Sequence, residues 1–405
     1  MLSTTGSRRT PLAVLAVASA VLLTLGACGR GSSAPTPANL SADQGVDATT
    51  INIGASMPLT GPIAGAGQAL SNGLKIAVGT INETGGVHGR KINATIYDDQ
   101  YSTPTQVANI QKLVSQDKVY ALVDLVGTQL IPASWTYLGS SGIPVWGPIS
   151  PTDPQMSNVF LLGAAIRDQA AVEMDYLIAK GFKKIGIIYL QGSFGDAEKV
   201  GITAVLAKHP DVTIVSEQSM AVTDLNPAPY VINAQKANPE AFILGCSNTQ
   251  SYLILKQAAS SAFKPFFIGN GNTVTTPQIS TLGSDEGLVS TAITQALDSP
   301  NPEVVKFNAE AAKYTPGIAP TLQTLQAYAN AMVFFHVLQS AGDNLSWKNF
   351  IKTAESTKNY DSGIYPPITL GPLPTGHSGA SGSLVTVLKN GTFTPETGKF
   401  IEPSA

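Results

Sequence analysis

The sequence predicts an α/β protein with two lobes, each built around a mainly parallel sheet. From Ile51 onward the hydrophobic pattern switches repeatedly between a period of two and helical spacing, which is typical of strand-helix-strand units. A second series of such units begins after Gly163. The chain of 405 residues is long enough for two cores, and its 43% hydrophobic and 13% charged residues favour compact layers over disorder.

The first residues have the features of an export signal. Arg8-Arg9 precedes a largely apolar run over residues 12–25, which is shorter than the ~20 residues that a membrane span requires. Leu25-Gly26-Ala27-Cys28 then resembles the lipobox of bacterial lipoproteins, which implies cleavage before Cys28 and acylation of its thiol. We therefore expect a signal peptide over residues 1–27 and a flexible linker over residues 28–49. The alternative is a secretory signal in which Cys28 is incidental.

The first lobe should open with an alternating strand over residues 51–57 and an amphipathic helix that ends at Gly85-Gly86. A strand over residues 92–96 follows. Pro104 suits the first position of the next helix, because its missing amide donor costs nothing there. Further elements are expected as strands at residues 121–125 and 143–146, with a helical stretch near residues 133–140 between them.

The second lobe should repeat this alternation after a helix near residues 168–179. Its strands are expected at residues 184–189, 212–216, 241–245 and 265–269. The chain then returns through residues 287–291, helices near residues 302–313 and 321–339, and a Gly/Pro-rich tract at residues 363–382. The final stretch, residues 383–400, alternates like a hairpin with Asn390-Gly391 at its turn.

Charge and cysteine content exclude several classes of protein. The formal charge of −3 becomes −5 once Arg8 and Arg9 are removed, which argues against a nucleic-acid partner. An acylated Cys28 leaves only Cys246, so an intrachain disulfide is excluded. Stability should therefore come from packing.

No catalytic or cofactor motif is complete. Gly65-Ala66-Gly67 has Leu70 where the dinucleotide fingerprint needs a third glycine, and residues 376–380 lack the last glycine of a nucleophile elbow. The histidines lack metal-ligand spacing. Asp98-Asp99 could suggest paired catalytic carboxylates, but capping of the turn that follows is the favoured interpretation. We expect a protein that is not an enzyme and that carries no cofactor and no metal.

One set of motifs runs through most of the chain after residue 50. They are Pro58-Leu59-Thr60-Gly61-Pro62, Gly85-Gly86-Val87-His88-Gly89-Arg90-Lys91-Ile92, Tyr97-Asp98-Asp99, Gly142-Ile143-Pro144-Val145, Phe194-Gly195 and Phe267-Ile268-Gly269. Together they resemble the branched-chain amino-acid-binding (leucine/isoleucine/valine-binding-like) family of substrate-binding lipoproteins of ABC importers. The resemblance implies a type I periplasmic-binding-protein fold, with two Rossmann-like lobes joined by three crossover strands and the ligand in the cleft. It places residues 50–163 and 289–382 in lobe one, and residues 164–288 and 383–405 in lobe two.

The resemblance also implies ligand-binding loops in lobe one. In open parallel sheets, ligands bind beyond the carboxyl ends of the strands. In the family, the loops after two neighbouring strands hold a ligand carboxylate with hydroxyls and amides. The matching residues here are Thr128, Gln129, Ile149, Ser150 and Thr152. The alternative is that these residues occupy ordinary turns.

Lobe two departs from the amino-acid pattern. Gly271 stands where amino-acid binders place an acidic residue that pairs with the ligand ammonium, and Ser247 replaces an aromatic residue that helps to close the site. A buried ammonium without a counter-charge would lose several kcal/mol, so we expect a ligand with amide, hydroxyl or carboxylate groups instead. Gln129, Ser150, Ser247 and Asn272 would hold it. Asp124, Asp153 or Asp196 could alternatively supply the missing charge.

Aromatic residues could also form part of the site. Tyr189, Phe194 and Tyr328 lie where an aromatic wall is possible, although aromatic residues at such positions, like Trp146, more often pack in the core.

The expected protein is an extracytoplasmic solute-binding lipoprotein, anchored to the outer face of the bacterial cell membrane. It should act as a monomer that captures a small polar solute between closing lobes and delivers it to an ABC permease. One alternative is a branched-chain amino-acid-binding protein with a substituted counter-charge. A second is a ligand-sensing receptor that is not coupled to transport, and a third is a hydrolase on the same scaffold.

Overall fold

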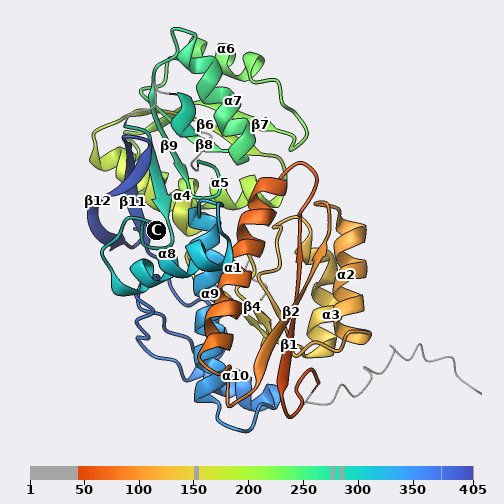
Figure 1. The fold of residues 1–405 in the computed structure, drawn as a ribbon. Helices are drawn as coiled ribbons and strands as arrows, with labels where there is room; N and C mark the ends of the chain where they lie inside the picture. Colours follow the sequence, from red (N-terminus) through yellow and green to blue (C-terminus); the bar gives the residue numbers. More distant parts are fainter. Residues whose placement is uncertain (1–43, 150–154, 275–278, 283–286, 375, 405) are drawn as a thin grey trace, which may run out of the picture. The chain divides into compact units, whose positions relative to one another are not determined.

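The computed structural model describes residues 44–149, 155–274, 279–282, 287–374 and 376–404 (Figure 1). Residues 39–405 form one compact unit. The expected signal peptide and Cys28 lie outside the described residues, as does most of the expected linker. Within the described part of the chain, no helix is long and apolar enough to cross a membrane.

The first sheet has five parallel strands in the order β2-β1-β3-β4-β5. They are β1 (Thr50–Met57), β2 (Lys91–Asp98), β3 (Ala121–Val123), β4 (Val145–Trp146) and β5 (Val159–Phe160). The parallel pairing confirms the expectation from the alternating pattern. It also brings the carboxyl ends of these strands to the same edge of the sheet.

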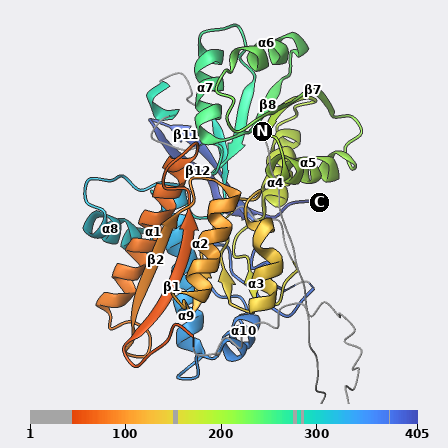
Figure 2. The same cartoon turned by 90° about the vertical axis from the view of Figure 1, so that its right-hand side faces the viewer.

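Helices cover both faces of this sheet, and we call the whole assembly the first lobe. The helices from the N-terminal part are α1 (Ala64–Glu83), α2 (Thr103–Ser115) and α3 (Trp135–Ser141), with a 3₁₀ turn at Ile131–Ser134. Three more come from the later part of the chain: α8 (Pro302–Tyr314), α9 (Leu322–Ser340) and α10 (Trp347–Glu355). Figures 1 and 2 show α2 and α3 side by side on one face, with α1 and α9 on the other.

The helices α1 and α9 approach each other closely because Gly73 has no side chain. A Cβ atom at Gly73 would lie 2.2 Å from the carbonyl oxygen of Thr324 and 2.9 Å from the Cβ of Ala327. This contact joins an early and a late part of the chain.

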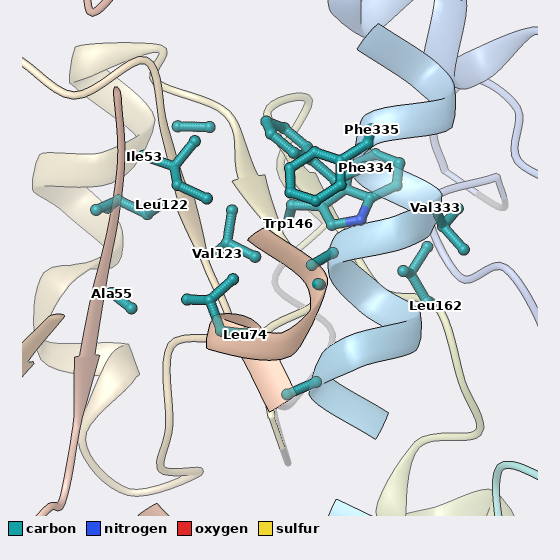
Figure 3. Close-up of a cluster of buried hydrophobic side chains, with 14 of the residues drawn as sticks. Ile53, Ala55, Leu74, Leu122, Val123, Trp146, Leu162, Val333, Phe334 and Phe335 are labelled. Atoms are coloured by element: carbon teal, nitrogen blue, oxygen red, sulfur yellow. The ribbon is translucent and has the colours of Figure 1, made fainter. Parts of the chain in front are cut away.

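The core of the first lobe lies between the sheet and these helices (Figure 3). Ile53, Leu122 and Leu74 are fully buried there. Trp146 is also fully buried, with its ring centroid 5.9 Å from that of Phe334, and its Nε1 donates to a backbone carbonyl of α9 at 2.9 Å. This confirms the core role expected for Trp146.

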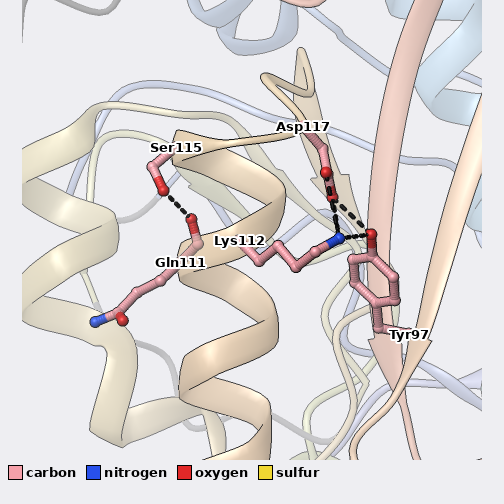
Figure 4. A network of polar contacts seen from close by, with 5 residues as sticks. All are labelled: Tyr97, Gln111, Lys112, Ser115 and Asp117. Atoms are coloured by element: carbon pink, nitrogen blue, oxygen red, sulfur yellow. Dashed lines mark hydrogen bonds and ion pairs between the residues drawn. The ribbon is translucent and has the colours of Figure 1, made fainter.

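A polar contact at the edge of the first lobe fixes the end of α2 against β2 (Figure 4). The Lys112 ammonium donates to the Tyr97 hydroxyl and lies 3.3 Å from the Asp117 carboxylate. The Tyr97 hydroxyl in turn donates to Asp117 at 2.9 Å. These partly exposed groups hold the helix in register with the strand.

The second sheet has seven strands in the order β12-β11-β10-β9-β8-β6-β7. Five are parallel: β6 (Lys184–Leu190), β7 (Thr213–Met220), β8 (Ala241–Gly245), β9 (Phe266–Asn270) and β10 (Val289–Ala292). The other two, β11 (Ser383–Lys389) and β12 (Thr392–Ile401), form the expected antiparallel hairpin. Asn390 and Gly391 have positive φ angles at its turn. Together with α4 (Ile166–Ala179), α5 (Ser193–Leu206), α6 (Ala228–Ala237) and α7 (Asn248–Ala259), this sheet forms the second lobe.

One strand differs from the expected division of the chain. Residues 289–292 were expected in lobe one, but β10 pairs with β9 on one side and with β11 on the other, inside the second sheet. The first lobe therefore resumes only after Ala292. The chain passes between the two sheets after β5, after β10 and before β11. This connectivity agrees with the expected two-lobe fold and its three crossovers.

Candidate ligand-binding site

A cavity of about 290 Å³ is lined by loops and helix starts from both lobes. This volume is at the lower end of the range for small-molecule sites. Its wall contains the residues that follow β3, β4, β6 and β8. The site therefore lies where parallel strands end, as the fold predicts.

The first-lobe wall is mainly apolar. Ile63, Ala66 and Leu70 line the cavity from the start of α1, and Val126 and Ile149 line it from the loops after β3 and β4. Gly65 has no side chain and Ala66 has a small one, which leaves room for a ligand close to the helix backbone.

Asp98 holds the loop that leads into α1. Its carboxylate accepts from the backbone nitrogens of Leu59 (2.9 Å) and Thr60 (3.2 Å), and from the Thr60 hydroxyl (2.6 Å). It also accepts from the backbone nitrogen of Gln100, in the turn before α2. The N-cap of α2 is Ser102 and has no side-chain cap, so the expected capping of the helical turn by Asp98 is not observed. The long-range anchoring of residues 59 and 60 was not expected.

Asp99 supports a different part of the wall. It accepts from the backbone nitrogen of Tyr101 at 3.0 Å, and Tyr101 lines the cavity. It also accepts from the Gln106 amide and the Ser56 hydroxyl. Burial raises the pKa of the Asp99 carboxyl. The acidic doublet thus organises loops, and neither carboxylate lines the cavity.

The second-lobe wall combines apolar and polar groups. Leu190, Phe194 and Cys246 provide the apolar part. Cys246 is fully buried, its Sγ lies 3.3 Å from the Ser251 hydroxyl, and burial raises the pKa of its thiol to about 12. The thiol is therefore neutral and acts as part of the apolar surface.

Polar groups come from the starts of α7 and α9 and from the turn after β9. Ser247 lines the cavity, but its hydroxyl also caps α7 by accepting from the Gln250 backbone nitrogen and donating to the Gln250 side chain. Asn272 and Gln323 both line this cavity and a smaller one of about 10 Å³. Thr321 caps α9 at the same wall.

The structure brings four of the expected ligand-binding residues together. Thr128, Ile149, Ser247 and Asn272 line the cavity. Phe194, considered for an aromatic wall, lines it as well. Ser150 and Thr152 lie outside the described residues. Direct contact of these residues with a ligand stays a prediction.

Three other expected residues do not line this cavity. Gln129 donates its side-chain amide to the carbonyl of Gln191, across the two lobes. The Tyr189 hydroxyl donates to Glu217 on β7 at 2.6 Å. The backbone nitrogen of Gly271 donates to the Thr291 carbonyl at 2.8 Å, and Gly271 lines the smaller cavity.

The alternative counter-charges are not in the wall either. Asp124 and Asp196 do not line the cavity, and Asp153 lies outside the described residues. Tyr328 is fully buried in the first-lobe core, where its ring centroid lies 5.1 Å from that of Phe307. Its expected core role is confirmed.

Sequence reasoning missed the contribution of the helix starts. Ile63, Thr321 and Gln323 were not proposed as site residues, although they line the cavity. The signal that could have found them is local. Thr321 is followed three residues later by Thr324, which completes a capping box.

Asp124 is buried behind the first-lobe wall. Its backbone has a φ of 54°, and one carboxylate oxygen accepts from the Asn330 amide at 2.6 Å. Asn330 also donates to the Gly147 carbonyl (3.0 Å) and accepts from the Tyr365 hydroxyl (2.7 Å). Burial raises the pKa of Asp124 well above its ordinary value. This cluster fixes the segments that lead into the loops after β3 and β4.

Two buried acids lie behind the second-lobe wall. The Asn270 amide lies 3.4 Å from Glu198, and Thr291 donates to Glu173 at 3.1 Å. Asn270 also accepts from the backbone nitrogen of Asn272. Burial raises the pKa of Glu173 to about 8, and burial together with Glu173 raises the pKa of Glu198. Glu173 is thus mainly neutral at pH 7, and burial favours the neutral form of Glu198 as well.

The cavity wall carries no charged side chain among its described residues, which include no Asp, Glu, Lys, Arg or His. Across the described chain, no group of three or more His, Cys, Asp or Glu side chains could hold a metal ion. The chemistry of the site is therefore that of hydroxyls, amides, backbone groups and apolar surfaces.

Curated proteins with similar sequences include Leu/Ile/Val-binding proteins. The Leu/Ile/Val-binding protein homolog 3 of Brucella melitensis is 26% identical over 298 residues, which cover 72% of this chain and 79% of the relative. The Leu/Ile/Val-binding protein BraC3 of Rhizobium johnstonii is 26% identical over 304 residues, covering 72% and 80% of the two chains.

Solved structures share the fold. A possible leucine/isoleucine/valine-binding protein from Rhodopirellula baltica matches 86% of this chain and 97% of its own, with a TM-score of 0.78 and 22% identity. A branched-chain amino acid ABC transporter protein from Thermus thermophilus with bound valine matches 89% and 98%, with a TM-score of 0.78 and 17% identity. A fatty acid ABC transporter substrate-binding protein from Thermomonospora curvata matches 89% and 93%, with a TM-score of 0.76 and 19% identity.

The family model of the periplasmic binding proteins matches residues 50–392, which include the first sheet, the second sheet except β12, and the described cavity wall. The chain therefore belongs to the periplasmic binding protein family and has its type I fold.

Proposed function

We propose that this protein is the solute-binding lipoprotein of an ABC importer, and that its ligand is a small molecule without an ammonium group. The observation that carries the proposal is the cavity between the lobes, whose described wall has no charged side chain. A bound α-amino acid would bury its ammonium there without a counter-charge, which is costly. Gly271, at the position of the acidic residue in amino-acid binders, supports the same conclusion.

Capture would proceed by closure of the lobes. A ligand that touches both walls binds the closed form better than the open form, and so shifts the population toward closure. The hydrogen bond from Gln129 to the Gln191 carbonyl joins the lobes directly. It would add to the stability of the closed form.

The proposal includes attachment to the outer membrane face through Cys28. The basic start, the short apolar run and the Leu-Gly-Ala-Cys sequence support it. Replacing Cys28 by Ser should release the protein from the membrane fraction, and mass spectrometry of the wild type should find diacylglycerol on Cys28. An unmodified Cys28 in a secreted protein would favour the ordinary signal peptide.

A ligand screen tests the central proposal. Residues 39–405 form one compact unit, so the chain from residue 29 can be used without its lipid. We would measure its melting temperature with carboxylic acids, amides, amino acids, sugars and nucleosides. A ligand at 100 times its dissociation constant should add about 2.7 kcal/mol. If no ligand class raises the melting temperature, the proposal of solute binding is contradicted.

Uptake then separates transport from sensing. Deletion of the gene should abolish import of the identified ligand in the native host. Binding without any change in uptake would instead support the sensory receptor. Conversion of the ligand during incubation, followed by mass spectrometry, would support the hydrolase.

The second candidate is a branched-chain amino-acid-binding protein with a substituted counter-charge. The Leu/Ile/Val-binding relatives favour it. It predicts that leucine, isoleucine or valine gives the strongest stabilisation in the same screen.

A further inference from the structure

The helix starts around the cavity decide which sign of charge it favours. Among the described residues, four helices begin at the wall: α1, α5, α7 and α9. Each helix start carries backbone N–H groups without an intrahelical acceptor and a partial positive charge. In α7 and α9 the capping hydroxyls of Ser247 and Thr321 accept from one of these groups each. The four starts come from both lobes, so a ligand in the cavity meets them from two sides.

Side chains do not reverse this preference. A carboxylate in the wall could neutralise the helix starts, but the described wall has none. The nearby buried acids Glu173 and Glu198 do not line the cavity, and burial raises the pKa of both, which favours their neutral forms. A ligand cation would thus lose its hydration without gaining a partner, whereas an anion would meet N–H donors and the amides of Asn272 and Gln323.

The rest of the wall fits an apolar body. Leu70, Val126 and Ile149 face the cavity from the first lobe, and Leu190 and Phe194 face it from the second. An apolar ligand body would therefore be covered on both sides when the lobes close. Sugars and other polyols would leave most of their hydroxyls without partners against these side chains.

We propose that the cavity selects small monocarboxylic acids with an apolar aliphatic or aromatic body and no ammonium group. This inference rests on the proposed function and specifies its substrate class. The carboxylate would lie toward the helix starts and the amides of Asn272 and Gln323, and the body would lie between the apolar walls.

Matched ligands test the inference. Leucine and 4-methylpentanoate share one carbon skeleton and differ by the α-amino group, as do phenylalanine and 3-phenylpropanoate. We would measure dissociation constants by calorimetry for both pairs and for 4-methylpentanamide and 4-methylpentylamine. At least one acid should bind tenfold or more tightly than its amino acid. 4-Methylpentanoate should also bind more tightly than 4-methylpentanamide, and the amine should bind least.

The outcomes separate this inference from the proposed function. Tighter binding of an amino acid than of its deaminated partner, or equal binding of acid and amide, would overturn the inference and leave solute binding intact. Strong binding of only sugars or nucleosides would do the same. If no ligand of any class binds, both the inference and the proposed function fail.

A charge-changing variant provides a second readout. Asn272→Asp keeps the shape of the side chain and adds a carboxylate to the wall, so binding of the acid should weaken at least tenfold and binding of the amine should improve. Asn93→Asp, on the exposed part of β2, is the matched control and should leave both unchanged. Unchanged acid binding in the folded Asn272→Asp variant would contradict an anion site at this wall.

Discussion

Both lobes bury acids behind the loops of the cavity, but they hold them differently. In the first lobe a single acid, Asp124, is bonded to Asn330, which also binds Gly147 and Tyr365. In the second lobe two acids, Glu173 and Glu198, lie around one amide, that of Asn270. Burial raises the pKa of the acids in both lobes. Only in the second lobe would ionisation also bring two negative charges together.

The largest expected effect comes from breaking the first-lobe cluster. Asn330→Leu removes the amide from Asp124, from the Gly147 carbonyl and from the Tyr365 hydroxyl, all of them buried. Chemical denaturation should show a loss of about 3–5 kcal/mol in the free energy of unfolding. Asn308→Ala, which removes one partly buried bond to the Leu297 carbonyl, should cost about 1 kcal/mol. Equal losses would show that the cluster adds nothing beyond a single bond.

The second prediction concerns pH and the paired acids. The pKa of Glu173 is raised from 4.5 to about 8 in the folded protein, so the folded state keeps a proton that the unfolded state loses. The free energy of unfolding should therefore fall as pH rises from about 4.5 to about 8. Glu173→Gln should flatten this slope and stabilise the protein at pH 8 by roughly 2–4 kcal/mol, since one pKa unit corresponds to about 1.4 kcal/mol.

The exposed Asp298→Asn serves as the control for this titration. Denaturation of both variants and the wild type at pH 5 and pH 8 gives the comparison. A wild-type slope that persists in Glu173→Gln would show that the pair does not respond to protons as proposed.

The third prediction adds an acid to the second lobe at an accessible place. A Cβ at Gly271 would meet its nearest atoms at 3.7 and 3.8 Å, so a side chain fits. Gly271→Asp should improve leucine binding relative to 4-methylpentanoate by about tenfold, or about 1.4 kcal/mol, by offering a counter-charge to the ammonium. Gly271→Asn is the matched neutral control. If Asp and Asn change the ratio equally, charge at this position does not set selectivity.

The smallest effect is expected for the contact that joins the lobes. Gln129→Ala removes the bond to the Gln191 carbonyl, which should weaken ligand binding by about 0.5–1.5 kcal/mol. Gln129→Glu keeps the size but cannot donate when ionised, so it should weaken binding at least as much. Calorimetry measures the affinity, and small-angle scattering measures the closed fraction. Unchanged values in both variants would remove this bond from the closing mechanism.

Local patterns in the sequence predicted much of the fold. Alternation over residues 51–57 and the Asn390-Gly391 turn depend on near neighbours, and the structure confirms both. β5, with only Val159 and Phe160, is too short for a periodic signal and was missed. β10 joins the second sheet because it pairs with residues about 20 and 95 positions away. The local hydrophobic periodicity carries no information about such distant partners.

The site shows the same limit. Thr128 and Ile149 were identified because the carboxyl ends of parallel strands mark the site in advance. Gln129 was assigned to the ligand because its partner, a backbone carbonyl 62 positions later, leaves no mark in the local sequence. Asp98 likewise binds residues 59 and 60, some 39 positions earlier. Polar side chains in loops have many possible partners, and only the folded chain selects among them.

The contact at Gly73 has a consequence for how the cavity adapts to ligands. At Gly73 the backbone of α1 packs directly against the backbone of α9, because glycine has no side chain between them. The two helices therefore cannot slide past each other without a clash between Gly73 and Thr324. Both helices contribute their starts to the cavity wall, through Ile63 and Thr321. This part of the wall should keep the same shape when different ligands bind. Ligands of different length would then have to be accommodated by the loops after β6 and β8, so that the range of accepted solutes is set mainly by the second lobe.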